Sequence, residues 1–259
     1  MTKVLLVTSG SGGVGKTTVA INLASALKDF GRHVVLLDLN VYSADASLHL
    51  GAFKVDYALQ DAAKKGNNIH EAVYMHSSGL LVIPSKISFN EEIDIQNIKK
   101  IINWLLGKTE LIIIDAPVIF DRNALKIAEN CDEAILVTTP DEISAIKTLK
   151  AIKMLEEKGV PVIGIIVNKF KSSEFNLSKE EIKNFIEKPI LEFVKEDKSL
   201  QESLKLKNPV VYIHPESDAT QSFKYLASKL IGENYAKKIE EKEKEGLYYY
   251  VLKQLGLRK

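Results

Sequence analysis

A glycine-rich stretch near the N-terminus carries the residue types and spacing that bind phosphate. Residues 10–17 match the pattern G-x-x-x-x-G-K-[ST] and end in Lys16 and Thr17. Glycines allow successive backbone N–H groups to face an anion, and the helix that follows adds the positive end of its dipole. We therefore predict that Lys16 lies against the β- and γ-phosphates of a nucleotide and that the Thr17 hydroxyl reaches Mg²⁺. The predicted nucleotide-binding residues of the loop are Gly10, Ser11, Gly12, Gly13, Val14, Gly15, Lys16, Thr17 and Thr18.

The same glycines also satisfy the dinucleotide fingerprint G-x-G-x-x-G over residues 10–15. Asp38 follows at about the distance expected of an acidic residue that binds a ribose. Two observations favour the phosphate loop. Lys16 and Thr17 have no role in gripping the pyrophosphate of a dinucleotide, and Asp115 ends a second apolar strand, where it can supply the carboxylate on the Mg²⁺ side.

Short apolar runs alternate with segments of helical period along the chain. The strand-length runs are residues 4–7, 33–37, 80–83, 111–114, 134–137, 162–167 and 190–194, and the helical patterns include 93–106, 143–157, 179–186 and a long polar helix over 220–245. The runs are continuous rather than alternating, which is typical of parallel strands covered on both faces. This order predicts an α/β fold, a doubly wound, mostly parallel sheet flanked by helices.

In such a sheet, ligands bind at the carboxyl ends of the strands. The residues that directly follow the strands are 9–18, 38–45, 115–117, 138–141 and 168–169. We therefore expect the phosphate loop and both aspartates to face one ligand.

Composition narrows the function classes. The chain has 259 residues, 46% of them hydrophobic and 27% charged, enough for one substantial core. A formal net charge of +1 gives no basic field for nucleic acid, and a single cysteine, Cys131, excludes disulfide frameworks and Cys-x-x-Cys metal or cluster sites. No apolar run approaches the roughly 18 residues of a spanning helix, and the N-terminus enters a strand directly, so we predict a cytoplasmic protein.

Together these motifs resemble the MinD/ParA family of deviant-Walker P-loop ATPases, closest to its MinD-like branch. The resemblance covers essentially the whole chain. It rests on residues 7–18, 34–38, 115–117, 138–140, 167–169 and 196–210. It implies ATP and Mg²⁺ as ligands, with Thr17, Asp38 and Asp115 at or near the metal, Lys16 and Asp38 in catalysis, and Asn168 at the adenine edge.

Four positions depart from the family pattern: Ser11, Asn40, Val118 in place of a glycine, and Lys195 in place of a proline. The first two bear on hydrolysis. Family members usually carry a second lysine at the position of Ser11, which reaches the partner's nucleotide in an ATP-sandwiched dimer. They usually carry aspartate at the position of Asn40, a predicted catalytic residue; asparagine can position the attacking water but cannot take its proton. Losing an oriented, charge-stabilising contact lowers turnover by roughly 10²–10³-fold, so we predict slow hydrolysis. Lys147 and Lys150 could replace the missing lysine, although both also suit a solvated helix face.

The composition changes after residue 245. Residues at helical period share one face there: Leu247, Tyr248, Val251, Leu252 and Leu255. The resemblance extends to the membrane-targeting tail of MinD in place and character, and two tails on one dimer would raise avidity. We therefore predict a P-loop ATPase domain over 1–245 and an amphipathic tail over 246–259. The tail would contact the inner face of the cell membrane peripherally; the alternative is packing on a protein surface.

The sequence thus predicts a MinD-like positioning or switch ATPase that forms a homodimer on ATP binding and attaches reversibly to a membrane or a partner. An activating partner protein is expected, although no residue identifies it. Two alternatives stay open: a non-hydrolysing ATP-binding scaffold that recruits a partner, and a ParA-like DNA-segregation ATPase. The near-neutral charge argues mildly against the DNA-binding alternative.

Overall fold

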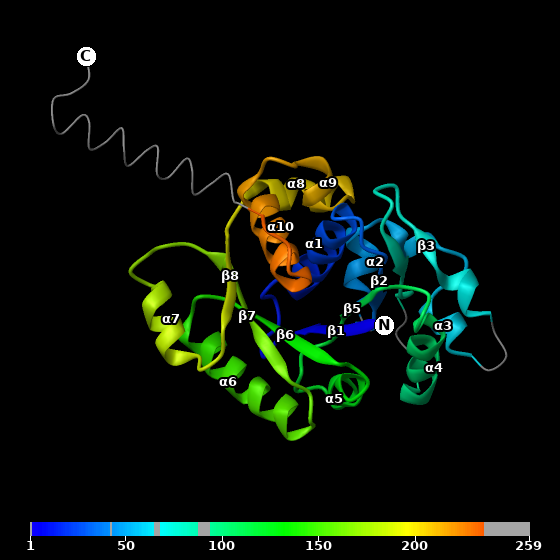
Figure 1. Ribbon diagram of the computed structural model, residues 1–259, viewed down its shortest axis with the longest axis horizontal. Helices are drawn as coiled ribbons and strands as arrows, with labels where there is room; N and C mark the ends of the chain where they lie inside the picture. Colours follow the sequence, from blue (N-terminus) through cyan, green and yellow to red (C-terminus); the bar gives the residue numbers. More distant parts are fainter. Residues whose placement is uncertain (1, 42, 65–67, 88–93, 236–259) are drawn as a thin grey trace, which may run out of the picture.

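One twisted sheet with helices on both faces forms the centre of the molecule (Figure 1). The computed structural model describes residues 2–41, 43–64, 68–87 and 94–235. Its strands are β1 (Lys3–Thr8), β2 (Val34–Asp38), β3 (Tyr74–Met75), β4 (Leu81–Ile83), β5 (Leu111–Asp115), β6 (Glu133–Thr138), β7 (Val162–Phe170) and β8 (Ile190–Lys195). They lie in the order β3-β4-β2-β5-β1-β6-β7-β8. Only the β3–β4 pair is antiparallel among the described strands, which confirms the predicted doubly wound, mostly parallel fold.

The helices cover the two faces of this sheet. They are α1 (Lys16–Asp29), α2 (Asp45–His49), η1 (Ala52–Lys54), α3 (Leu59–Ala62), η2 (Ile69–Ala72), α4 (Ile95–Leu105), α5 (Arg122–Ala128), α6 (Glu142–Glu157), α7 (Lys179–Phe185), α8 (Lys198–Leu206), α9 (Val210–Ile213) and α10 (Asp218–Ile231). One core lies under α1, α9 and α10, and the other under α4, α5 and α6. In Figure 1, α1 and α10 lie on one side of the sheet and α5 and α6 on the other.

Both faces of the central strands are buried, which explains their continuous apolar runs. In β1, Leu5 and Val7 pack into the core under α1, whereas Val4 and Leu6 pack into the opposite core. Successive side chains of a strand point to opposite faces, so each face needs its own apolar residues.

The sequence predicted one helix over residues 220–245, and the predicted C-terminal end was wrong. Helix α10 ends at Ile231, because Gly232 adopts a left-handed conformation with φ 71. The Glu233 N–H then donates to the Ser228 carbonyl at 2.9 Å, which satisfies a terminal carbonyl of the helix. Residues 236–245 and the tail predicted over 246–259 lie outside the described residues.

The sheet order brings the predicted site residues together. Strand β5 lies between β1 and β2, and Asp38 and Asp115 are partners across the β2–β5 pairing. The loop that leaves β1 therefore emerges beside two strands that both end in aspartate. No helix in the described part of the chain is both long and apolar enough to cross a membrane.

Candidate nucleotide-binding site

The phosphate loop connects β1 to α1 and is held in place by α6 and β7. A Cβ on Gly10 would lie 2.5 Å from the Lys147 carbonyl oxygen of α6, too close for any residue but glycine. Gly15 has φ 88, and a Cβ there would lie 2.2 Å from the Asn168 amide nitrogen. That nitrogen donates to the Val14 carbonyl at 2.8 Å. Two neighbouring elements therefore fix the start and the end of the loop.

A lysine that follows the Asn168 position also contacts the loop. The Lys169 ammonium donates to the Gly13 carbonyl at 2.7 Å, and Lys169 itself has φ 54. Because a left-handed backbone is costly for a residue with a Cβ, this conformation is held by its surroundings. The sequence predicted that Lys169 lies at this edge of the sheet, but it did not predict the contact with the loop.

Two buried aspartates lie beside the loop. The Thr17 hydroxyl donates to Asp115 Oδ2 at 2.7 Å. Asp38 Oδ2 accepts from the Ser47 backbone N–H at 3.2 Å and from its hydroxyl at 3.0 Å, and Asp38 Oδ1 accepts from the Asn40 N–H at 3.2 Å. Both carboxylates are fully buried. The structure thus brings together Thr17, Asp38 and Asp115, the predicted metal residues.

The electrostatics of this pair favour a bound cation. Burial raises the pKa of Asp38, and the nearby Asp115 charge raises it further. Burial also raises the pKa of Asp115, although the Lys16 ammonium and the Thr17 hydroxyl oppose that shift. Asp115 Oδ1 is buried and has no hydrogen-bond partner among the described residues. Mg²⁺ prefers carboxylate, hydroxyl and water oxygens, so these three side chains fit it, directly or through bound water. When bound, Mg²⁺ would supply charge stabilisation at the phosphates.

The remaining predicted residues occupy distinct positions at the same edge. The Ser11 hydroxyl and the Asn168 side-chain oxygen are buried, with no partner in the described ranges. The Asn168 amide faces the loop backbone, so its role at an adenine edge stays a prediction. Lys147 and Lys150 are exposed on α6. Asn40 donates from its side chain to Asp45 Oδ2 at 3.0 Å, a contact that sequence reasoning missed.

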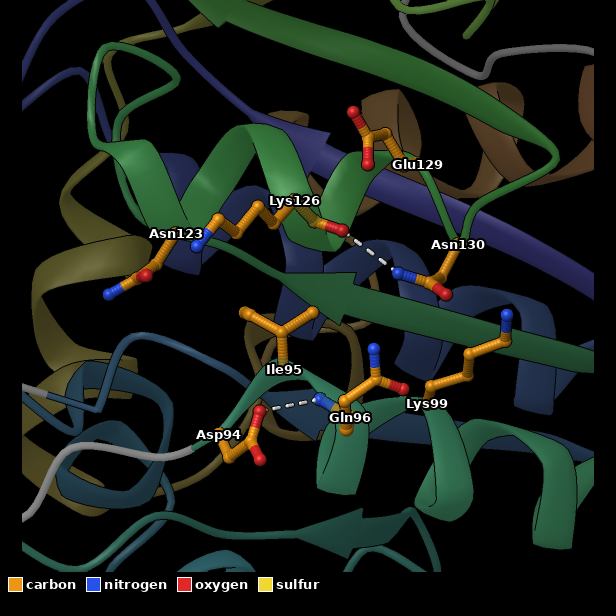
Figure 2. A pocket seen from close by; sticks show the side chains of 8 residues that line it. All are labelled: Asp94, Ile95, Gln96, Lys99, Asn123, Lys126, Glu129 and Asn130. Carbon is orange, nitrogen blue, oxygen red and sulfur yellow. Dashed lines mark hydrogen bonds between the residues drawn. The ribbon is translucent and has the colours of Figure 1, made fainter.

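A groove of about 780 Å³ lies elsewhere, between α4 and α5 (Figure 2). It contains none of the predicted site residues. Asp94 accepts from the Gln96 backbone within the α4 start, and Asn130 donates to the Lys126 carbonyl beside α5. Each contact joins residues that are close in sequence, and neither of these two contacts bridges the groove.

The geometry defines a class of protein. A glycine loop between the first strand and a helix, with a threonine hydroxyl bonded to a strand-terminal aspartate, is the arrangement of a P-loop NTPase. A family model described as ParA, NUBPL iron-transfer P-loop NTPase, matches residues 1–231. The chain belongs to this ParA family of P-loop NTPases.

Similar proteins agree with this assignment. An uncharacterized ATP-binding protein of Methanocaldococcus jannaschii is 29% identical over 98% of this chain and 97% of its own length. The crystal structure of the cell division ATPase MinD of Pyrococcus furiosus has a TM-score of 0.84 and 30% identity, covering 90% of this chain and 99% of that one. The septum site-determining protein MinD of Pyrococcus horikoshii, complexed with Mg-ADP, has a TM-score of 0.84 and 31% identity, covering 89% and 96%. The predicted MinD/ParA resemblance is confirmed, and the family implies ATPase chemistry with a nucleotide and Mg²⁺.

Proposed function

We propose that the chain is a MinD-like switch ATPase that binds Mg-ATP, dimerises on it and attaches reversibly to a membrane or a protein partner. The observation that carries the proposal is the Thr17–Asp115 hydrogen bond beside a glycine loop fixed by α6 and β7. Its output would be an interaction rather than a metabolic product. We place the protein in the cytoplasm, at times peripherally on the inner face of the cell membrane.

Hydrolysis is proposed to be slow. Ser11 places a hydroxyl where the resemblance implies a lysine, and Asn40 places an amide where it implies a carboxylate. Single-turnover measurement with enzyme in excess over radiolabelled ATP tests this rate directly. Turnover as fast as that of a lysine-bearing member of the family, measured side by side, would contradict slow hydrolysis.

Dimerisation on ATP is supported by apolar surface beside the loop. Ile143 and Ile146 are 67% and 40% exposed on α6, and the carbonyl of the next residue, Lys147, packs against Gly10. Contiguous exposed apolar side chains mark interaction surfaces, and we propose that Ile143 and Ile146 belong to one. Size-exclusion chromatography with light scattering, with and without Mg-ATP, tests the proposal; a monomer under both conditions contradicts it.

Membrane attachment is proposed for the amphipathic tail, residues 246–259. About nine residues make a weak anchor, because so short a helix is marginal in water and must fold on binding. The dimer would therefore bind more tightly than the monomer. Co-sedimentation with anionic liposomes compares the full chain with a chain that ends at Glu245. Equal lipid binding by both would overturn the proposal.

A second candidate is a non-hydrolysing ATP-binding scaffold, which the same two positions, Ser11 and Asn40, favour. It predicts Mg-ATP binding with no release of phosphate.

Iron transfer, which the family model's description names, receives no support from the residues. The sequence has one cysteine, Cys131, and burial raises the pKa of its thiol. No group of three or more histidine, cysteine or acidic side chains within the described ranges could hold a metal ion.

A further inference from the structure

Two side chains, Asn40 in the connection after β2 and Asp45 at the start of α2, form a pair. The Asn40 side-chain nitrogen donates to Asp45 Oδ2 at 3.0 Å. An ionised carboxylate only accepts hydrogen bonds, so the amide nitrogen must face Asp45 and the amide oxygen must point away from it. The Asn40 backbone N–H donates to Asp38 Oδ1 at 3.2 Å. Asn40 is therefore fixed on one side by the metal-site aspartate and on the other by Asp45.

The backbone of this segment is folded so that Asp45 returns to Asn40. The N–H groups of Ser43 and Ala44 both donate to the Asn40 carbonyl, at 3.2 and 2.8 Å. Ala44 is fully buried and has φ 47, in the left-handed region. This conformation is unfavourable for a residue with a Cβ and persists only where the surroundings impose it. Without the turn, Asp45 would not reach the amide.

The Asp45 charge also influences two ionisable groups, Asp115 and His49. Burial raises the pKa of Asp115, and the Asp45 charge adds to that shift. Burial lowers the pKa of His49, one turn along α2, and the Asp45 charge opposes that shift. The Asp45 charge thus acts on the metal-site aspartate of β5, a strand remote in sequence.

We propose that Asp45 is a positioning residue for ATP hydrolysis, acting through Asn40 on the water that attacks the γ-phosphate. The inference rests on the proposed function of the site. In the reaction the water oxygen bonds to the γ-phosphorus, and the bond to the bridging oxygen breaks. ADP keeps the electron pair, and the protons of the water pass to the released phosphate and the solvent.

In this proposal Asn40 and Asp45 together orient the attacking water, which a single carboxylate could do alone. The Asn40 amide oxygen, turned away from Asp45, accepts a hydrogen from the water and orients it. The negative charge of Asp45 holds the amide in that orientation and polarises it, which makes its oxygen a stronger acceptor. Asparagine alone would rotate between two orientations, one of which presents its nitrogen to the water.

The experiment measures single-turnover hydrolysis and, separately, the affinity for a non-hydrolysable ATP analogue with Mg²⁺. Asp45→Asn is compared with Asn40→Ala, with the exchanged pair Asn40→Asp/Asp45→Asn, and with the control Asp29→Asn. Asp29 ends α1 and is paired with Lys224 at 2.8 Å. Loss of a residue that orients a ligand-binding group typically costs about 10–100-fold. We expect a loss of this size in the hydrolysis rate of Asp45→Asn and of Asn40→Ala, whereas both variants keep their affinity for the analogue.

Exchange of the pair distinguishes positioning from a merely structural role. It returns a carboxylate to position 40, so we expect the rate to recover to the wild-type value or above it. Asp45→Asn hydrolysing at the wild-type rate would overturn the role of Asp45, as would an exchanged pair no faster than Asp45→Asn. If Asp45→Asn does not fold, Asn40→Ala and the exchanged pair decide. A wild-type chain that binds Mg-ATP without turnover would instead overturn the proposed hydrolysis, and this role with it.

Discussion

The Thr17 hydroxyl and Asp115 Oδ2 are 2.7 Å apart, which joins the first turn of α1 to the end of β5. The other carboxylate oxygen of Asp115 is buried with no hydrogen-bond partner in the described part of the chain. A buried carboxylate oxygen without a hydrogen-bond partner is costly unless a ligand satisfies it. In the protein without ligand this oxygen of Asp115 is therefore unfavourable, and a bound cation would stabilise it.

Replacing Asp115 tests that arrangement. Asp115→Asn removes the buried charge but keeps an oxygen for the Thr17 hydroxyl. We expect the nucleotide-free variant to melt a few degrees higher than the wild type, since about 1 kcal/mol shifts the Tm of a chain of this size by about 2–4 °C. The contribution of Mg²⁺ to nucleotide affinity should be lost. Calorimetry measures both quantities.

The matched control is Asp121→Asn, which alters the carboxylate that caps α5 and leaves the site intact. It should keep the Mg²⁺ dependence of nucleotide binding. An Asp115→Asn variant that melts lower than the wild type while retaining that dependence would contradict the assigned role of Asp115.

The raised pKa values of Asp38 and Asp115 predict opposite pH trends for stability and ligand binding. As the pH falls from the raised values toward the ordinary 3.8 of aspartate, both carboxyls gain protons in the folded chain before they do so in the unfolded one. Their contribution to the stability of the nucleotide-free chain therefore rises with acidification. Protons compete with Mg²⁺ for the same oxygens, so Mg-nucleotide affinity should fall over that window. Titration calorimetry across the window checks the trend, and Asp115→Asn should flatten it.

The sequence contained enough to predict the phosphate loop and both aspartates, because a fixed spacing and two strand ends carry them. The role of Asp45 could not be read in the same way. That role depends on the left-handed backbone conformation of Ala44. Alanine rarely adopts this conformation, so the sequence gives no signal for the turn. The two-residue strand Tyr74–Met75 was also missed, because it is too short for a pattern. The end of α10 was readable from Gly232, but the charged residues beyond it favoured a longer helix.

The exposed residue Ile143 provides a test of the proposed dimer. Ile143→Asp places a charge on the apolar surface next to the phosphate loop, where burial in an interface would be costly. We expect Mg-ATP to produce little or no dimer in light scattering, while monomeric nucleotide affinity stays near the wild-type value. Met75→Asp is the matched control, because Met75 is 68% exposed on the edge strand β3, compared with 67% for Ile143. Equal dimer fractions for the two variants would place the interface elsewhere.

Ser11 provides the most direct test of why turnover should be slow. Its hydroxyl is buried with no partner in the described ranges, and its carbonyl accepts from the Ser9 hydroxyl at 2.7 Å, so the side chain adds no interaction that the loop needs. Ser11→Lys would add the charge that the family resemblance implies for the partner's nucleotide. We expect single-turnover hydrolysis to rise by roughly 10²-fold, the scale of one oriented charge contact in a transition state. Ser11→Met, which has a long side chain without the charge, should give no such rise. If Ser11→Lys and Ser11→Met hydrolyse ATP at the same rate, the missing lysine does not limit turnover, and the amide at Asn40 becomes the remaining explanation.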